Sequence, residues 1–302
     1  MRILSALLAS LLLLGCTDNQ PSATTETSAP EQSDGSAMTT QPSLSDVLAA
    51  QPEQTQARYV HRHPAQTLEF FGIEPGMTVM EALPGGGWYS KILLPYLGDE
   101  GALIGANYTT SMRRLFGFYT EEQLQQGETW TTDWPAKAAA WTQEANTPVS
   151  GFIFGSLPQN MTESADAVMF IRALHNLARF EDQGGFLTAA LNDAYNILKP
   201  GGVVGVVQHA IAETAPDDWA KGNRGYLKQS FVIAQMEQAG FIFEEASAIN
   251  ANPKDQPQDG DVVWRLPPVL SGSKDNPDQA AMMQTIGESN RMTLRFRKPS
   301  AS

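Results

Sequence analysis

A short strand, a run of glycines and a helix follow one another between residues 77 and 94, and no other stretch constrains the fold as strongly. Residues 77–82 are apolar enough for a buried strand, and the turn P-G-G-G at 84–87 separates them from a helix that starts near Trp88. Three consecutive glycines are costly to order unless the backbone needs positive φ or must approach another group closely. The free N–H groups of the helix N-terminus would suit an anionic or carboxylate-bearing ligand.

Two well-known glycine motifs fit this stretch only in part. A P-loop needs a lysine and then Ser or Thr after its last glycine, but here Ser90 precedes Lys91. A dinucleotide fingerprint would need glycine or alanine at Ser90. The strand ends close to an acid, Glu81, which neither motif requires. An ordinary strand-to-helix turn of a doubly wound fold remains an alternative at this point.

Glu81 followed by the glycine turn resembles motif I of class I S-adenosylmethionine (SAM) dependent methyltransferases. The stretch D-A-V-M-F-I-R-A-L-H-N-L at 166–177 resembles motif IV of that family, and L-K-P-G-G at 198–202 resembles the turn before its fifth strand. N-P-K-D at 252–255 and E-S-N-R-M-T-L-R-F-R-K-P at 288–299 fit an often exported subfamily of bacterial predicted methyltransferases. The resemblance covers about residues 58–299.

The resemblance implies a doubly wound α/β domain with a seven-stranded, mostly parallel sheet whose last strand is antiparallel. The alternation of strand and helix patterns favours this class independently of the family. Strands are expected over 77–82, 102–107, 149–157, 166–171, 203–208, after Gly240, and over 292–297. Helices are expected over 44–60, 64–71, 88–97, 136–145, 184–198 and 226–239, the last with Phe231, Ala234, Gln235 and Gln238 at helical spacing. Residues 250–287 are expected to form a long connection over the sheet edge where ligands enter.

The resemblance also implies SAM as cofactor. The positions that it assigns to cofactor binding are Glu81, Pro84, Gly85, Gly86, Gly87 and Asn107. The sequence departs from the family at two places. Leu83 stands where the fuller motif I has its first glycine, and Asn107 stands where the family has an acid that binds the ribose hydroxyls. An asparagine can still donate and accept hydrogen bonds, but without the charge-assisted component.

Three polar residues follow the predicted fourth and fifth strands: Arg172, His175 and His209. Ligands of open α/β sheets bind at the carboxyl ends of the strands, so these side chains should lie beside the glycine turn and face the substrate. His175 could act as a general base near neutral pH, and Arg172 could bind a carboxylate or another anion. The alternative for His175 is a histidine that satisfies buried backbone groups.

The spacing of His61 and His63 could suggest a metal pair. The chain has only four histidines and one cysteine, and it lacks the H-E-x-x-H pattern. We therefore expect no metal site.

The N-terminus predicts export and lipid attachment. Arg2 precedes an apolar run over 3–14 that is too short to span a membrane, and the run ends on L-L-G-C, which resembles the lipobox of bacterial lipoproteins. Cys16, the only cysteine, would be lipidated and become the first mature residue. The predicted organisation is a signal peptide at 1–15, a lipidated and flexible linker at 16–43, and a methyltransferase-like domain at 44–302. Thr17 in place of Asp favours the periplasmic side of the outer membrane by resemblance.

The charge balance limits the partners. Loss of Arg2 on cleavage would leave 19 basic side chains against 33 acidic ones. This excess of negative charge argues against nucleic acid and against electrostatic binding to anionic lipid, so the membrane would be reached through the lipid anchor only. The expected partner is a small-molecule substrate. The sequence thus favours a lipid-anchored SAM-dependent methyltransferase. The alternative is a non-catalytic, lipid-anchored ligand-binding protein on the same fold, and a dinucleotide enzyme is the weakest option.

Overall fold

The computed structural model describes residues 41–142, 146–273 and 275–300. The predicted signal peptide, Cys16 and most of the predicted linker lie outside the described residues. Within the part that is described, no helix is long and apolar enough to cross a membrane.

Seven strands of the described chain form one sheet in the order β3-β2-β1-β4-β5-β7-β6. β1 to β5 pair in parallel, whereas β7 is antiparallel to both of its neighbours, β5 and β6. This is the seven-stranded class I methyltransferase fold, and it confirms the fold that was predicted from the sequence. The strands are β1 Thr78–Ala82, β2 Ala102–Asn107, β3 Val149–Ile153, β4 Ala165–Ile171, β5 Leu198–His209, β6 Ile242–Ser247 and β7 Arg291–Arg297.

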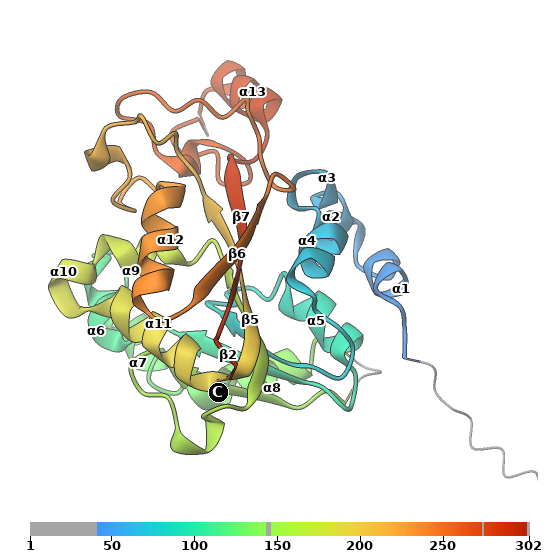
Figure 1. Cartoon of the computed structure of the whole chain (residues 1–302). Coiled ribbons are helices and arrows are strands. Elements are labelled where there is room, and N and C mark those ends of the chain that lie inside the picture. The colour runs from blue at the N-terminus through green and yellow to red at the C-terminus, as the bar shows by residue number, and fades with distance from the viewer. Residues whose placement is uncertain (1–40, 143–145, 274, 301–302) are drawn as a thin grey trace, which may run out of the picture. The chain divides into compact units, whose positions relative to one another are not determined.

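Helices cover both faces of the sheet, as Figure 1 shows with α12 and α11 on one side and α4 and α5 on the other. Along β1 the side chains alternate between the two faces, so Val79 packs with α4 and α5 and Met80 packs with α9 and α11. Both side chains are fully buried, which is typical of a parallel sheet between two helical layers. The longer helices are α4 Pro64–Phe71, α5 Ser90–Leu97, α8 Trp130–Ala139, α11 Phe186–Ile197, α12 Gln229–Gln238 and α13 Pro277–Ile286. The shorter ones are α1 Leu44–Ala49, α2 Glu53–Gln56, α3 Tyr59–Arg62, α6 Thr110–Leu115, α7 Glu121–Gln126, α9 Leu174–Arg179 and α10 Glu181–Gly184, with 3-10 turns η1 Gln159–Met161, η2 Asp217–Trp219 and η3 Val263–Arg265.

Two predicted helices were wrong in their extent. The single helix expected over 44–60 is divided into α1, α2 and α3, and Pro52 caps the second of these. The helix expected over 136–145 is α8, which begins at Trp130 and ends at Ala139. Its Trp130 and Trp134 rings stack at a centroid distance of 5.2 Å and lie against Gly105 of β2, where no side chain interferes. The aromatic residues, rather than the alanines that follow them, therefore fix the position of this helix.

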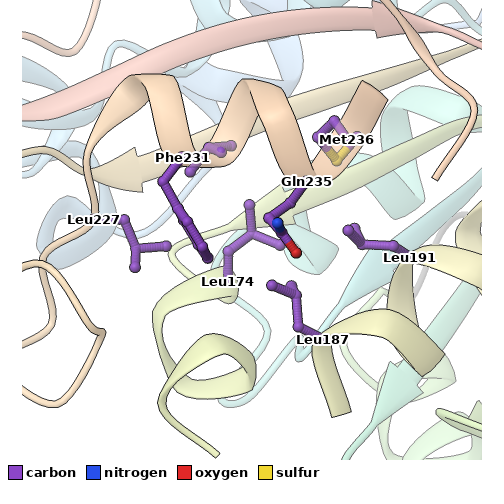
Figure 2. A pocket seen from close by; sticks show the side chains of 8 residues that line it. Leu174, Leu187, Leu191, Leu227, Phe231, Gln235 and Met236 are labelled. Carbon is purple, nitrogen blue, oxygen red and sulfur yellow. The ribbon is translucent and has the colours of Figure 1, made fainter. Parts of the chain in front are cut away.

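The buried face of α12 also differs from the predicted spacing. Val232 and Met236 are buried, whereas Phe231 is 37% exposed. In Figure 2 Phe231 and Gln235 border a small apolar gap, opposite leucines that belong to α9 and α11. The gap has a volume of about 10 Å³, which is close to the space of one water molecule. It is a packing defect and not a ligand site.

The segment over 250–287 lies at the edge of the sheet where it was predicted. His209, the last residue of β5, pairs with Arg291, the first residue of β7, so the segment enters β7 at the carboxyl end of β5. The buried carboxylate of Asp255 fixes its base. This carboxylate accepts hydrogen bonds from Tyr226 Oη at 3.1 Å, Arg265 Nη2 at 2.8 Å and Asn290 N at 2.9 Å.

Candidate functional site

The residues of the glycine turn after β1 have different structural roles. Leu83 has φ +54°, so it adopts the left-handed conformation that glycine adopts most readily. Gly85 and Gly87 have φ +55° and +75°, and a side chain on Gly87 would collide with the ring of Trp141. Gly86 has no positive φ, and a Cβ built on it meets no atom within 4 Å. Gly86 is therefore the position at which the backbone is open to a ligand.

Glu81 lies in β1, buried, beside the start of α5. This helix begins at Ser90, two residues later than predicted, and Ser90 Oγ donates a hydrogen bond to Glu81 Oε2 at 2.5 Å. Burial raises the pKa of Glu81 to about 7, although the Ser90 hydrogen bond acts in the opposite direction. Glu81 thus holds the glycine turn against the helix, and it carries only part of a negative charge at neutral pH.

Asn107 ends β2, one strand away from Glu81. Its Oδ1 accepts a hydrogen bond from the backbone N of Tyr108 at 2.8 Å. The side-chain oxygen is therefore engaged, and Nδ2 remains to donate to a ligand. An acid at this position would instead offer a second oxygen that accepts.

Arg172 and His175 follow β4, as predicted. Arg172 has φ +56°, and its backbone N donates to Val207 O of β5 at 2.6 Å. His175 lies in the first turn of α9 with Nδ1 at 3.3 Å from Gln208 Oε1. An amide oxygen only accepts, so Nδ1 carries the proton and Nε2 of His175 is left as an acceptor.

His209 ends β5, buried beside His175 at a ring-centroid distance of 5.3 Å. Its Nδ1 lies 2.6 Å from Ser289 Oγ. Burial lowers the pKa of His175 to about 4 and holds the pKa of His209 well below its ordinary value. The near-neutral titration predicted for His175 is thus removed by desolvation. Both imidazoles are neutral at pH 7 and are weak proton acceptors.

A cluster of arginines, which the sequence patterns did not predict, completes the site. Glu288 is buried immediately before β7 and accepts hydrogen bonds from Arg58 Nε at 2.9 Å and Arg62 Nε at 3.3 Å. Arg291 Nη1 lies 3.3 Å from the other oxygen of Glu288. Burial by itself raises the pKa of Glu288, but the three guanidiniums outweigh it and hold the pKa below the usual value. We call Arg58, Arg62, Arg291 and Glu288 the arginine cluster.

Two signals for this cluster were present in the sequence. The H-R-H run at 61–63 contains Arg62, which is the residue of this run that reaches the site. The E-S-N-R run at 288–291 contains both Glu288 and Arg291. Charged residues that directly precede an apolar strand can lie at the ligand edge of a sheet, as Glu288 does here. Among the described residues, no group of three or more His, Cys, Asp or Glu side chains could hold a metal ion.

The sheet brings these residues to one place. β1 and β4 are neighbours at the point where the strand order reverses, and β5 lies beside β4. The charge of Arg172 acts on the pKa values of Glu81, His175 and His209, which lie on or after these three strands. The glycine turn, the two histidines and the arginine cluster therefore form one candidate site at the carboxyl edge. Asn107 approaches it from β2.

No protein-family model and no curated protein sequence matches the chain. Solved structures resemble it at low identity. The [4+2]-cyclase SpnF is 16% identical over 80% of this chain and 81% of its own, with a TM-score of 0.49. An arsenic(III) SAM methyltransferase from Chlamydomonas reinhardtii is 16% identical over 86% and 74%, with a TM-score of 0.43. A SAM-dependent methyltransferase from Aquifex aeolicus is 16% identical over 69% and 94%, with a TM-score of 0.45.

Replacement of Glu288 by Gln should destabilise the protein strongly. It would leave the buried guanidiniums of Arg62 and Arg291 without a counter-charge, which costs about 3–5 kcal/mol when one member of a buried pair is lost. Urea unfolding at pH 7 measures this loss. Glu121→Gln, which breaks only the exposed pair with Arg114, is the control and should leave the midpoint unchanged. Equal midpoints for the two variants would show that Glu288 does not carry this role.

The depressed pKa of His175 predicts a specific pH dependence of stability. Between pH 6.5 and about pH 4 the unfolded chain binds a proton at this histidine and the folded protein does not, so stability falls as the pH falls. The contribution lost by pH 5 is about 2 kcal/mol. The raised pKa of Glu81 acts in the opposite direction over pH 4.5 to 7, because there the folded protein holds a proton that the unfolded chain releases.

The informative quantity is therefore the difference between the wild type and His175→Asn. Urea unfolding at pH 7 and at pH 5 should show that the variant loses about 2 kcal/mol less on acidification than the wild type does. Parallel pH profiles would mean that His175 titrates normally in the folded protein.

Proposed function

We propose that this chain is a SAM-dependent methyltransferase that acts on a small molecule. The observation that supports this most directly is the open backbone at Gly86, at the end of β1, where the strand order reverses. Gly85 and Gly87 shape the turn, and Pro84 precedes it. An added Cβ at Gly86 would fill the space that a closely bound cofactor needs.

The described residues fit SAM in most respects. The glycine turn would hold the amino-acid end of the cofactor, with Glu81 fixing the turn from behind through Ser90. Asn107 would donate from Nδ2 to a ribose oxygen, since its Oδ1 is engaged by Tyr108. When bound, the cofactor supplies an electrophilic sulfonium methyl group. The protein then has to position the acceptor in line with that group and exclude water.

The two histidines would receive the proton of the methyl acceptor. Nε2 of His175 is free to accept because Nδ1 faces the amide oxygen of Gln208. Its pKa of about 4 makes His175 a weak base, which suits an acceptor that is itself acidic. His209 would support this step from β5, held by Ser289.

A non-catalytic ligand-binding protein is the second candidate. Asn107 favours it, because its neutral amide stands where the family has an acid, and its oxygen already accepts a hydrogen bond from Tyr108 N. The predicted export also separates the domain from the cytosol, where SAM is made. In this candidate the same site binds a ligand but catalyses no methyl transfer.

We further propose that Cys16 is lipidated and holds the mature protein on the periplasmic side of the outer membrane. The support is the apolar run followed by L-L-G-C and the absence of another cysteine from the sequence. The excess of acidic residues leaves the lipid as the means of attachment.

Titration with SAM and with S-adenosylhomocysteine tests the methyltransferase. Calorimetry on the full-length protein in detergent should give micromolar affinity, which corresponds to about −8 kcal/mol. Gly86→Val should abolish binding without loss of stability, because its side chain enters free space, and Gly86→Ala should weaken binding less. Asn107→Asp should tighten binding by about 1 kcal/mol, since one oxygen can keep the Tyr108 bond while the other accepts from the ribose. A folded wild type that binds neither compound at millimolar concentration would favour the second candidate.

Replacement of Cys16 by Ser should release the protein from the membrane or leave it uncleaved. Membrane fractionation of the producing bacterium and mass spectrometry of the mature N-terminus measure this. Thr17→Ser is the matched control and should leave attachment unchanged. A wild-type N-terminus that begins elsewhere, or that carries no lipid, would contradict the anchor.

A further inference from the structure

The guanidinium of Arg172 has no partner within the described residues. Its side chain makes no hydrogen bond, ion pair or ring contact there, and its Nε is buried and unsatisfied. Arg172 as a whole is only half-buried, so part of the side chain is open to solvent. A buried donor without a partner costs free energy, and in a native structure it calls for a ligand or an ion.

The backbone holds Arg172 in this position at a further cost. It has φ +56°, which is unfavourable for a residue with a side chain. Of the five non-glycine residues with positive φ in the described chain, three lie here: Arg172, His63 beside the arginine cluster and Leu83 in the glycine turn. Backbone strain of this kind is concentrated at functional sites. The short bond from Arg172 N to Val207 O fixes the residue to β5.

Within residues 41–142, 146–273 and 275–300, the carboxylates near Arg172 do not balance the positive charge around it. Arg58, Arg62 and Arg291 all pair with Glu288, so this one carboxylate serves three guanidiniums. Burial, together with the nearby charge of Arg172, lowers the pKa of Arg62 to about 9. Glu81, the other acid that senses Arg172, is partly protonated at neutral pH. An excess of positive charge is thus concentrated in a protein whose formal net charge is −13.

A second unsatisfied donor lies in the same region. The guanidinium of Arg62 packs over the ring of Trp88 at 4.6 Å, and Trp88 Nε1 is buried with no hydrogen-bond partner in the part of the chain that the structure describes. An indole N–H can only donate. Arg172 and Trp88 therefore both call for acceptor atoms, and an anion would provide them.

We propose that Arg172 binds the oxyanion of an acidic methyl acceptor, a small organic acid with a carboxylate or phosphate group. The planar guanidinium matches such a group by two parallel hydrogen bonds. This inference rests on the proposed methyltransferase function and names its substrate class. The carboxylate of the cofactor is the other source of the same chemistry, and the test below separates the two.

The first measurement uses simple anions as probes on the full-length protein in detergent. Succinate and inorganic phosphate at millimolar concentration should raise the melting temperature relative to chloride at equal ionic strength. Arg172→Gln should lose this rise. Arg297→Gln should keep the rise in melting temperature. This substitution removes the same charge, but Arg297 lies at the opposite end of the sheet, where it pairs with Glu244.

Arg172→Lys provides a second variant if Arg172→Gln does not fold. Lysine keeps the positive charge but lacks the two parallel N–H donors of the guanidinium. The anion concentration needed for the same rise in melting temperature should therefore increase by at least about tenfold. Equal effects of succinate, phosphate and chloride on the wild type would overturn the proposal. An unchanged effect in either Arg172 variant would do the same.

The second measurement identifies the source of the anion. S-adenosylhomocysteine and methylthioadenosine, which lacks the amino-acid end, are titrated into the wild type and Arg172→Gln. For an acidic acceptor, both affinities should change by less than about threefold, and succinate should still stabilise the wild type saturated with S-adenosylhomocysteine. A loss of at least about tenfold for S-adenosylhomocysteine alone would assign Arg172 to the cofactor and overturn the proposal. If the wild type binds neither nucleoside, the proposed methyltransferase function is refuted. The anion measurement would then still decide whether Arg172 binds an oxyanion.

Discussion

The site depends on one buried carboxylate. Glu288 precedes β7 and neutralises arginines that come from the helices before β1 and from β7 itself. Without it, the charges of Arg62 and Arg291 would have to be hydrated, and the carboxyl edge of the sheet would open to water. The ion pairs are distributed unequally, because this one carboxylate pairs with three guanidiniums, and Arg172 forms an ion pair with no carboxylate of the described residues. The same arrangement that stabilises this edge of the fold therefore leaves it short of negative charge.

The glycine turn is a second case in which one stretch serves stability and binding at once. Gly87 is required because Trp141 packs on it, and Leu83 adopts a left-handed backbone without being a glycine. Of the three glycines in the turn, Gly86 is the one at which an added Cβ meets no atom of the described residues within 4 Å. A turn whose neighbours are fixed by packing presents its one open position without further ordering, which reduces the entropic cost of binding.

Much of the fold could be predicted from the sequence, because strands that are buried on both faces consist of runs of apolar residues. The strands β1 and β2 begin and end close to the predicted residues. The position of α8 could not be predicted, because it depends on tryptophans of this helix that pack on glycines of β2 and β3. The edge that carries Arg172, His175 and His209 follows from topology alone. The arginine cluster does not, because the sequence does not reveal which distant charge reaches Glu288. The pKa values of the histidines depend on burial, which has no local signature.

The pairing of Arg58 with Glu288 joins residues that lie 230 positions apart in the chain. Contacts of such long separation form late, because the loop between them must first be ordered. The glycine turn lies in the first third of the domain, but Glu288 and Arg291, which complete the site, lie just before and at the start of the last strand. A chain that is still emerging, or that crosses a membrane unfolded, would therefore have no binding site. Occupancy of the site would report that folding is complete from one end of the domain to the other.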